Sequence, residues 1–383
     1  MPESATTNDL QIRPLAPGEA PALAAIMRRS FGGIAGMMFS PGQAAYVAEL
    51  DGRMVGGVTL AAFRIDAKRR GGVVKWVFTL PEARGRGVAS ALVDRALVWF
   101  EDQGVSDAFA CIEGHNAGSA NRFAERGFEP LGFVEQVRCY GTALVRVWWH
   151  ANHVADVGHF VWARRLDGDA ADAEPAPVVG DDPATAWGLG GFAVTIALHA
   201  VFGVVMLARL GRDVDLLAAA HVALAVALVV GVRTAAMALA GRALGLRLRY
   251  RPWETGMTLA GAISLLFGGT FVAPGGLYPR SRTWSLRQLG PRLAGVAAAG
   301  AVAVLALGWV AHLLTTSTGV ASTATAAVAA PVLFFARFLL IFDVLLPVFP
   351  FTAFAARRVL EASRPASAVL ALGTVGLWVA SLM

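Results

Sequence analysis

The 383-residue chain has little cysteine, little lysine and no apolar segment at its start, and each scarcity narrows the class of protein. Its two cysteines, Cys111 and Cys139, are too few for a disulfide framework or a cysteine-rich metal site. The opening residues MPESATTNDLQIRPL lack the apolar core of a secretory signal, so we expect no cleavable signal peptide. No basic stripe with interleaved aromatic residues is present, and we therefore expect no nucleic acid among the partners.

Acidic residues and lysine are scarce mainly in the second half of the chain. Residues 1–182 carry 18 Lys and Arg against 22 Asp and Glu, whereas residues 183–383 carry 15 Arg, no Lys and 5 acids. The second half also holds several apolar runs near the ~20 residues that cross a bilayer. The sequence predicts a multi-pass protein of the cell membrane with a soluble N-terminal domain. Because no signal precedes that domain, we expect it in the cytoplasm.

Residues 1–166 show the patterns of an α/β domain with a mixed sheet and helices on its faces. Asp51-Gly52 is a strong hairpin signal between two of the expected strands. The expected strands are 10–15, 44–50, 54–63, 72–80 and 107–113, and the expected helices are 18–32, 88–102 and 117–126. After Gly127-Phe128 we expect further strands, the last of which is 159–165.

The stretch 77–92, VFTLPEARGRGVASAL, combines a strand, a glycine-rich turn and a helix that begins at Val88. The first N–H groups of such a helix have no acceptor within the helix and lie at the positive end of its dipole. The stretch therefore predicts a seat for a phosphate group.

Two motifs in this domain resemble those of the GCN5-related N-acetyltransferases. TLPEARGRGVA (79–89) is similar to the pyrophosphate loop of that family, and NAGSANRFAERGF (116–128) is similar to its second signature, an Asn, a helix and Gly-Phe. The resemblance covers most of residues 8–166. It implies the fold of that family, acetyl-CoA as the acetyl donor and an amine as the acceptor.

The resemblance also implies roles for particular residues. The backbone of the strand before the loop, at Val77, Phe78 and Thr79, would pair with the pantetheine arm. Asn116 would hold the cofactor, or alternatively cap a helix. Arg84 and Arg86 would add positive charge, although a solvated turn accounts equally well for Arg86. The pyrophosphate would lie on the backbone of Gly85, Arg86, Gly87, Val88, Ala89 and Ser90.

Two positions depart from the family pattern and leave the proton chemistry open. Phe123 stands where a thiol-protonating Tyr is common in the family, and we expect it among the residues around the cofactor. Cys111 stands where a general-base Glu is frequent. Glu113 faces the same side of its strand as Cys111 and is our candidate base. Alternatively, Glu113 has no catalytic role and simply faces solvent at the end of its strand. His115 and Tyr140 are weaker candidates for the base.

Residues 148–159, WWHANHVADVGH, bring His150, His153, Asp156 and His159 together in sequence. Histidine and carboxylate bind zinc, but this spacing fits no established zinc pattern. We therefore expect no metal, and we interpret the segment as an extended loop or a strand pair near the substrate groove.

Residues 167–184 are rich in Asp, Ala and Pro and predict an acidic, flexible linker. The membrane domain follows at 185–383. A simple count gives six spans, but it would place the arginines near 280–292 and 357–364 outside the cytoplasm, against the positive-inside rule. We therefore expect five spans and a glycine-rich re-entrant segment near 256–273.

The membrane domain also resembles, loosely, the site-2-type intramembrane metalloproteases. The similar segments are RTAAMALAGRALGLRLR (233–249), LAGVAAAG (293–300) and LLPVFPFTAFAARRVL (345–360). Arg233, Thr234, Met237 and Thr352 replace the metal ligands and the catalytic Glu of that family. The resemblance therefore implies a protease scaffold without protease chemistry. Because charges at membrane depth are usually paired, we expect Arg233 to pair with Asp343.

These sequence features are consistent with two functions. The first is a membrane-anchored N-acetyltransferase that acts on an amine at the cytoplasmic face. The alternative is a catalytically weak acyl-CoA-binding sensor or scaffold coupled to the membrane domain.

Overall fold

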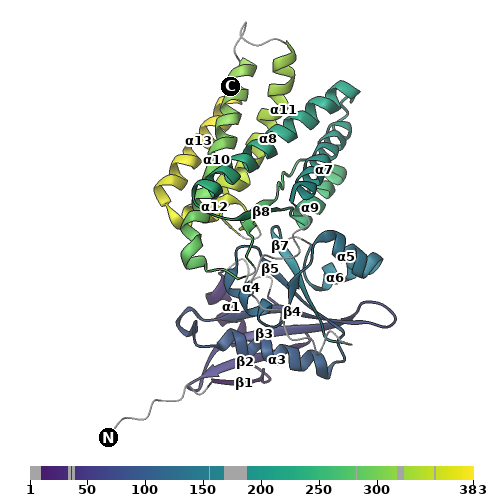
Figure 1. Cartoon of the computed structure of the whole chain (residues 1–383), viewed down its shortest axis with the longest axis vertical. Coiled ribbons are helices and arrows are strands. Elements are labelled where there is room, and N and C mark those ends of the chain that lie inside the picture. The colour runs from purple at the N-terminus through teal and green to yellow at the C-terminus, as the bar shows by residue number, and fades with distance from the viewer. Residues whose placement is uncertain are drawn as a thin grey trace. The chain divides into compact units, whose positions relative to one another are not determined.

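The computed structural model of the chain is shown in Figure 1. It describes residues 10–32, 36, 39–154, 156–167, 188–281, 283–316, 323–348 and 351–383. The expected linker 167–184 lies outside the described residues apart from Asp167, and so does Arg282 of the expected cytoplasmic arginines.

The chain forms two compact units, and each unit is built from several separate stretches of the sequence. The first unit draws on residues 1–112, 119–153 and 161–178. The second draws on residues 179–383 and on two short segments from earlier in the chain, 113–118 and 154–160. The domain boundaries expected from the sequence stay a prediction.

A seven-stranded sheet with strand order β1-β2-β3-β4-β5-β7-β6 organises the N-terminal part of the chain (Figure 1). Strands β1 to β4 are joined antiparallel, and β4 pairs parallel with β5. The fold is therefore the expected mixed sheet. The strands are β1 Leu10–Pro14, β2 Ala44–Leu50, β3 Arg53–Arg64, β4 Arg70–Thr79, β5 Asp107–Glu113, β6 Glu129–Pro130 and β7 His159–Arg165.

Helices cover the sheet through two apolar clusters. Helix α1 packs Leu23, Ile26 and Met27 against strand residues that include Val47 and Phe78. A second cluster joins residues of α5 and α6 to the sheet through Phe63, Phe109, Tyr140, Leu144, Val147 and Val161. The helices of this part are α1 Ala20–Phe31, α3 Val88–Asp102, α4 Ala117–Ala124, α5 Phe133–Tyr140 and α6 Leu144–His150, with a 3-10 turn, η1, at Pro81–Ala83.

Two strands follow Gly127-Phe128 as expected, the two-residue β6 and the last strand β7, but the sequence did not predict the helices α5 and α6 between them. Valine and aromatic residues favour strands, which explains why no helix was expected there. The buried residues nevertheless recur at helical spacing, at Gln136 and Tyr140 in α5 and at Leu144 and Val147 in α6. Trp148 and Trp149 thus lie in a helix, not in an extended loop.

The second unit is mainly helical, and among its described residues four helices are long and apolar enough to cross a membrane. These are α7 Gly188–Arg209, α8 Leu216–Ala243, α10 Leu286–Thr316 and the segment Thr325–Leu345, which joins most of α11 (Thr323–Leu340) to the π-helical turn η5 (Ile341–Leu345). The remaining elements are β8 Leu248–Arg251, α9 Glu254–Phe267, β9 Gly276–Pro279, α12 Ala355–Ala362 and α13 Arg364–Ala380.

The two other expected membrane segments form shorter helices. The re-entrant segment near 256–273 corresponds to the 14-residue α9 and the non-helical residues that follow it. The last expected span corresponds to α13, which has 17 residues. The count of five spans and one re-entrant segment stays a prediction.

The second unit contains a buried ion pair, as the sequence predicts. Arg233 Nε and Nη2 donate to the two carboxylate oxygens of Asp343 at 2.6 and 3.0 Å, and both side chains are at most 1% exposed. Arg233 Nη1 also donates to the carbonyl of Gly275 at 3.0 Å, and the amide of Ala355 donates to Asp343 at 3.2 Å. One pair therefore ties α8 to the π-helical turn, to the segment after α9 and to α12.

We expect Asp343→Ala to destabilise the protein by about 3–5 kcal/mol, because it leaves the Arg233 guanidinium buried without a counter-charge. The double variant Arg233→Leu with Asp343→Leu should lose less, because it removes both buried charges. Thermal unfolding of the detergent-solubilised full chain measures both. Asp213→Ala, an exposed acid before α8, is the matched control, and equal stability of Asp343→Ala and this control would contradict the prediction.

Candidate active site

The glycine-rich loop enters α3 through two residues with left-handed backbone geometry. Gly85 and Gly87 both have φ of +80°, and Gly87 is the N-cap of α3. Only glycine adopts this geometry without strain, so the backbone conformation itself explains both glycines. A Cβ at either position would meet no atom within 4 Å, so neighbouring side chains do not impose the choice.

The start of α3 has the features of an anion site. Gly87 supplies no capping side chain, and the first turn contains no acidic residue. The amides of Val88, Ala89 and Ser90 have no carbonyl acceptor within the helix because of their position in its first turn. Arg84 is exposed, whereas the guanidinium of Arg86 lies 3.6 Å from the carboxylate of Asp51. The loop therefore offers backbone amide donors at the positive end of a helix, with the exposed Arg84 beside them in sequence.

Strand β4 leaves its parallel partner halfway along its length. Its pairing with β5 runs from Gly71↔Asp107 to Val74↔Ala110, although β4 continues to Thr79. At the same point Lys75 is an extra residue in the pairing with β3, because Thr59 pairs with Trp76 and Leu60 with Val74. A bulge increases the local bend and twist of a strand. In the part of the chain that the structure describes, β4 thus has no pairing with β5 from Lys75 to Thr79, and we call this stretch, which includes Val77, Phe78 and Thr79, the open edge of β4.

The expected base Glu113 lies at the end of β5, within the second unit. Its Oε1 is 3.3 Å from Nδ1 of His115, and the same nitrogen lies 2.8 Å from Nη1 of Arg358 in α12. Since arginine only donates, Nδ1 of His115 accepts this hydrogen bond. His115 also packs against the ring of Tyr278 at 4.4 Å between centroids. Glu113 is therefore held in a charged cluster and is not a solvent-facing strand end.

Burial and charge set the protonation of this cluster. Burial, together with the nearby Arg358, lowers the pKa of His115 from 6.5 to about 4, so the imidazole is neutral at pH 7. Burial raises the pKa of the Glu113 carboxyl, but its close contact with His115 and the nearby positive charge of Arg358 outweigh that effect and lower it. Glu113 is thus a carboxylate at neutral pH. Its lowered pKa makes it a weaker proton acceptor than an ordinary Glu.

The other expected residues lie near the start of α4 and in the core. Asn116 directly precedes α4, and its amide donates to the carbonyl of Glu113 at 2.9 Å. Phe123 is 2% exposed and meets Phe128 edge to face at 5.0 Å, so it packs in the core. Tyr140 is buried, its hydroxyl lies 3.3 Å from Asp107, and burial raises its pKa, so it stays protonated.

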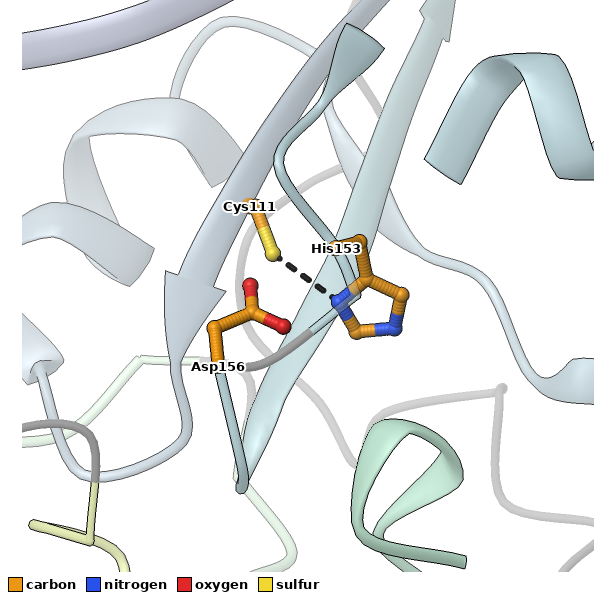
Figure 2. A group of neighbouring side chains, drawn as sticks. All are labelled: Cys111, His153 and Asp156. Carbon is orange, nitrogen blue, oxygen red and sulfur yellow. Dashed lines mark hydrogen bonds between the residues drawn. The ribbon is translucent and has the colours of Figure 1, made fainter. Parts of the chain in front are cut away.

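Sequence reasoning did not foresee the contact between Cys111 and His153. Cys111 is the first residue of β5 beyond the last pair with β4, and its Sγ lies 3.1 Å from Nδ1 of His153 (Figure 2). His150 stacks instead on Phe63 at 4.3 Å. Cys111, His153 and Asp156 are donor types that zinc accepts, so the expected absence of a metal stays a prediction. The sequence spacing of Cys111 and His153 did not predict their contact, because the helices α5 and α6 separate them along the chain.

The family comparison agrees with this geometry. Residues 17–128 match the family model described as Acetyltransferase (GNAT) family. The N-terminal part of the chain therefore has the expected fold, a mixed sheet with flanking helices and the glycine-rich loop between β4 and α3. A search of curated proteins gave no match. The resemblance of the C-terminal half to intramembrane metalloproteases stays a prediction.

Solved acetyltransferases give similar structures over less than half of the chain. N-acetylglutamate synthase from Neisseria gonorrhoeae, complexed with coenzyme A, is 22% identical over 43% of this chain and 37% of that one, with a TM-score of 0.30. The ribosomal-protein-S18-alanine N-acetyltransferase from Escherichia coli is 12% identical over 42% and 97%, with a TM-score of 0.30. An acetyltransferase from Elizabethkingia anophelis with acetyl-CoA bound is 10% identical over 42% and 100%, with a TM-score of 0.31. These similarities are too low to indicate an acceptor.

The neutral, buried His115 makes stability depend on pH. Its pKa is about 4 in the folded protein against 6.5 for a free histidine, so the unfolded chain binds more protons between these values. The contribution of His115, up to about 3 kcal/mol, is therefore complete above pH 6.5 and is lost as the pH falls toward 4. Thermal unfolding of the full chain across this range, compared with His115→Gln, isolates the effect. A variant whose stability falls as steeply as that of the wild type would show that His115 has no such role.

Proposed function

We propose that this protein is a membrane-anchored N-acetyltransferase that transfers the acetyl group of acetyl-CoA to an amine at the cytoplasmic face of the cell membrane. The observation that carries the proposal is the open edge of β4 leading into the glycine turn at the start of α3. Acetyl transfer in general agrees with the family match of residues 17–128.

The binding mode follows from the backbone. The pyrophosphate of acetyl-CoA lies on the amides from Gly85 to Ser90, where the helix dipole and the arginines of the loop favour an anion. The pantetheine arm lies along Val77, Phe78 and Thr79 as an added strand would, because that edge offers backbone donors and acceptors. The hydroxyl of Thr79 is buried without a partner among the described residues, which agrees with a polar ligand at this edge. Asn116, which directly precedes α4, would hold the cofactor, as the second signature implies, whereas the core position of Phe123 gives its side chain no role there.

Positioning and polarisation supply most of the chemistry in this proposal. Amines attack thioesters readily once the two are aligned, so orientation and hydrogen bonds to the carbonyl oxygen count more than a strong base. Glu113 is the last residue of β5, and its carboxylate attracts the cationic amine. Its lowered pKa suits it to hold the ammonium ion better than to deprotonate it.

The membrane placement rests on helix length and arginine distribution. Within the part of the chain that the structure describes, four helices are long and apolar enough to cross a bilayer. The segments around Arg247, Arg280, Arg287 and Arg357, between or at the ends of the long helices, are rich in arginine, which favours the cytoplasmic side. An acetyltransferase on that side has access to acetyl-CoA.

A second candidate function is an acyl-CoA sensor or scaffold with little turnover. The specific observations are that Phe123 packs in the core without a hydroxyl and that Glu113 is engaged by His115. In this case the helical unit is a protease-like scaffold whose Arg233–Asp343 pair replaces a metal centre. Mass spectrometry of membranes with and without the protein separates the two functions, because an enzyme adds acetyl groups to amines and a sensor does not.

We expect Gly87→Glu to weaken acetyl-CoA binding by at least about tenfold, because a carboxylate at the start of α3 repels the pyrophosphate and strains the turn. Gly104→Glu is the matched control: Gly104 also has a positive φ, of +63°, but it lies just beyond the other end of α3. Titration calorimetry of the purified full chain measures binding. Equal affinity of the Gly87→Glu and Gly104→Glu variants would remove the proposed cofactor site.

A further inference from the structure

Cys111 lies where the proposed cofactor ends. If the pyrophosphate lies at the start of α3, the arm runs back along β4 from Thr79 to Lys75, which is ~13 Å at the usual rise of a strand. This path ends where β4 and β5 separate, at the pair Val74↔Ala110. Cys111 is the next residue of β5. In this arrangement, the thioester of the cofactor and Cys111 are both next to the point where β4 and β5 separate.

His153 is built into the fold as a fixed partner for this thiol. It is 0% exposed, whereas Cys111 is partly exposed. The amide of His153 donates to the carbonyl of Trp148 at 2.8 Å, and its ring meets the Trp148 ring edge to face at 5.1 Å. Trp148 in turn donates from Nε1 to Oε1 of the fully buried Gln136 at 2.8 Å, and Gln136 donates to the carbonyl of Leu131 at 3.0 Å. This chain of contacts fixes the imidazole beside Sγ.

A thiol beside an imidazole has a defined chemistry. In the tautomer with its proton on Nε2, the imidazole accepts the thiol proton at Nδ1, and the resulting thiolate is the nucleophilic form of cysteine. Since Nδ1 is the nitrogen that faces Sγ at 3.1 Å, the orientation suits this transfer (Figure 2).

We propose that Cys111 accepts the acetyl group as a thioester before an amine receives it, with His153 as the proton carrier. This proposal rests on the proposed acetyltransferase function. Cys111 Sγ bonds to the carbonyl carbon of acetyl-CoA, and its proton passes to Nδ1 of His153. The bond from that carbon to the sulfur of CoA breaks, and the proton of His153 passes to the CoA thiolate. One thioester replaces another, so no oxidant or reductant is needed.

The second half of the reaction restores the dyad. An amine in its neutral form bonds to the carbonyl carbon of the Cys111 thioester, and the carbon–sulfur bond breaks. The amine loses one proton to His153, and Cys111 recovers it as a thiol. The acetylated amine leaves, and no separate carboxylate base is required, which fits the engagement of Glu113 by His115.

Acid-quenched peptide mass spectrometry tests the proposal on the full chain in detergent. Acetyl-CoA is added without an amine, and the expected result is one acetyl group on the Cys111 peptide, reduced at least about tenfold in rate by His153→Gln. Cys139→Ala is the matched control, because Cys139 is the other cysteine and is exposed on α5. It should leave the acetylation of Cys111 unchanged, whereas Cys111→Ala abolishes it.

Two further measurements separate the possible failures. Calorimetry with coenzyme A shows whether the cofactor binds at all, and an absence of binding would remove the proposed function together with the dyad. Binding without acetyl on Cys111, combined with full amine acetylation by Cys111→Ala, would overturn the dyad alone. Stoichiometric zinc that is lost in Cys111→Ala would also overturn it, because the thiol would then be a metal ligand.

Alkylation supplies a readout that does not depend on acetyl transfer. A thiol activated by an imidazole reacts with iodoacetamide below the pH at which an ordinary cysteine does, near 8.5. We expect the pH profile of Cys111 to lie below that of Cys139 and to shift upward in His153→Gln. Identical profiles for the two cysteines would contradict an activated thiol.

Discussion

The parallel pairing of β4 with β5 stops after Val74, and the candidate site depends on this limit. A strand in the middle of a sheet normally has both edges occupied, so an edge that opens halfway is an unused row of hydrogen-bonding groups. The bulge at Lys75 marks the point of separation. Beyond it, β4 leads directly through η1 and the two left-handed glycines to the positive end of α3. Strand edge, turn and helix dipole are thus one continuous backbone surface.

Much of this surface could be predicted from the sequence because it is local. The hairpin at Asp51-Gly52, the helix that begins at Val88 and the glycine turn between β4 and α3 each depend on neighbouring residues. The helices α5 and α6 were missed because their β-branched and aromatic residues favour strands, and only their packing against the sheet decides the outcome. The contact of Cys111 with His153 joins residues 42 positions apart, and it exists because α6 ends beside β5. No local pattern encodes such a contact.

The helical unit shows the same division between what was predictable and what was not. The pairing of Arg233 with Asp343 could be expected, because two opposite charges in apolar surroundings are each costly alone. The geometry around the pair could not. Asp343 lies on a π-helical turn, and Gly300 lets α10 pack close to Met237 and Arg233 of α8, since a Cβ there would lie 2.7 Å from Met237. Such details follow from how neighbouring helices fit, which hydropathy alone does not specify.

The division of the chain into units has a practical meaning for anyone who wishes to express its parts. Residues 113–118 and 154–160 belong to the helical unit, where His115 accepts from Arg358 and the carbonyl of Asp156 lies 3.3 Å from the hydroxyl of Thr255. A fragment cut at the linker would carry both segments but none of these partners. Its buried imidazole and its strand ends would then face water. The order of residues along the chain is therefore a poor guide to where this protein can be divided, and intact protein is the appropriate material for studying its chemistry.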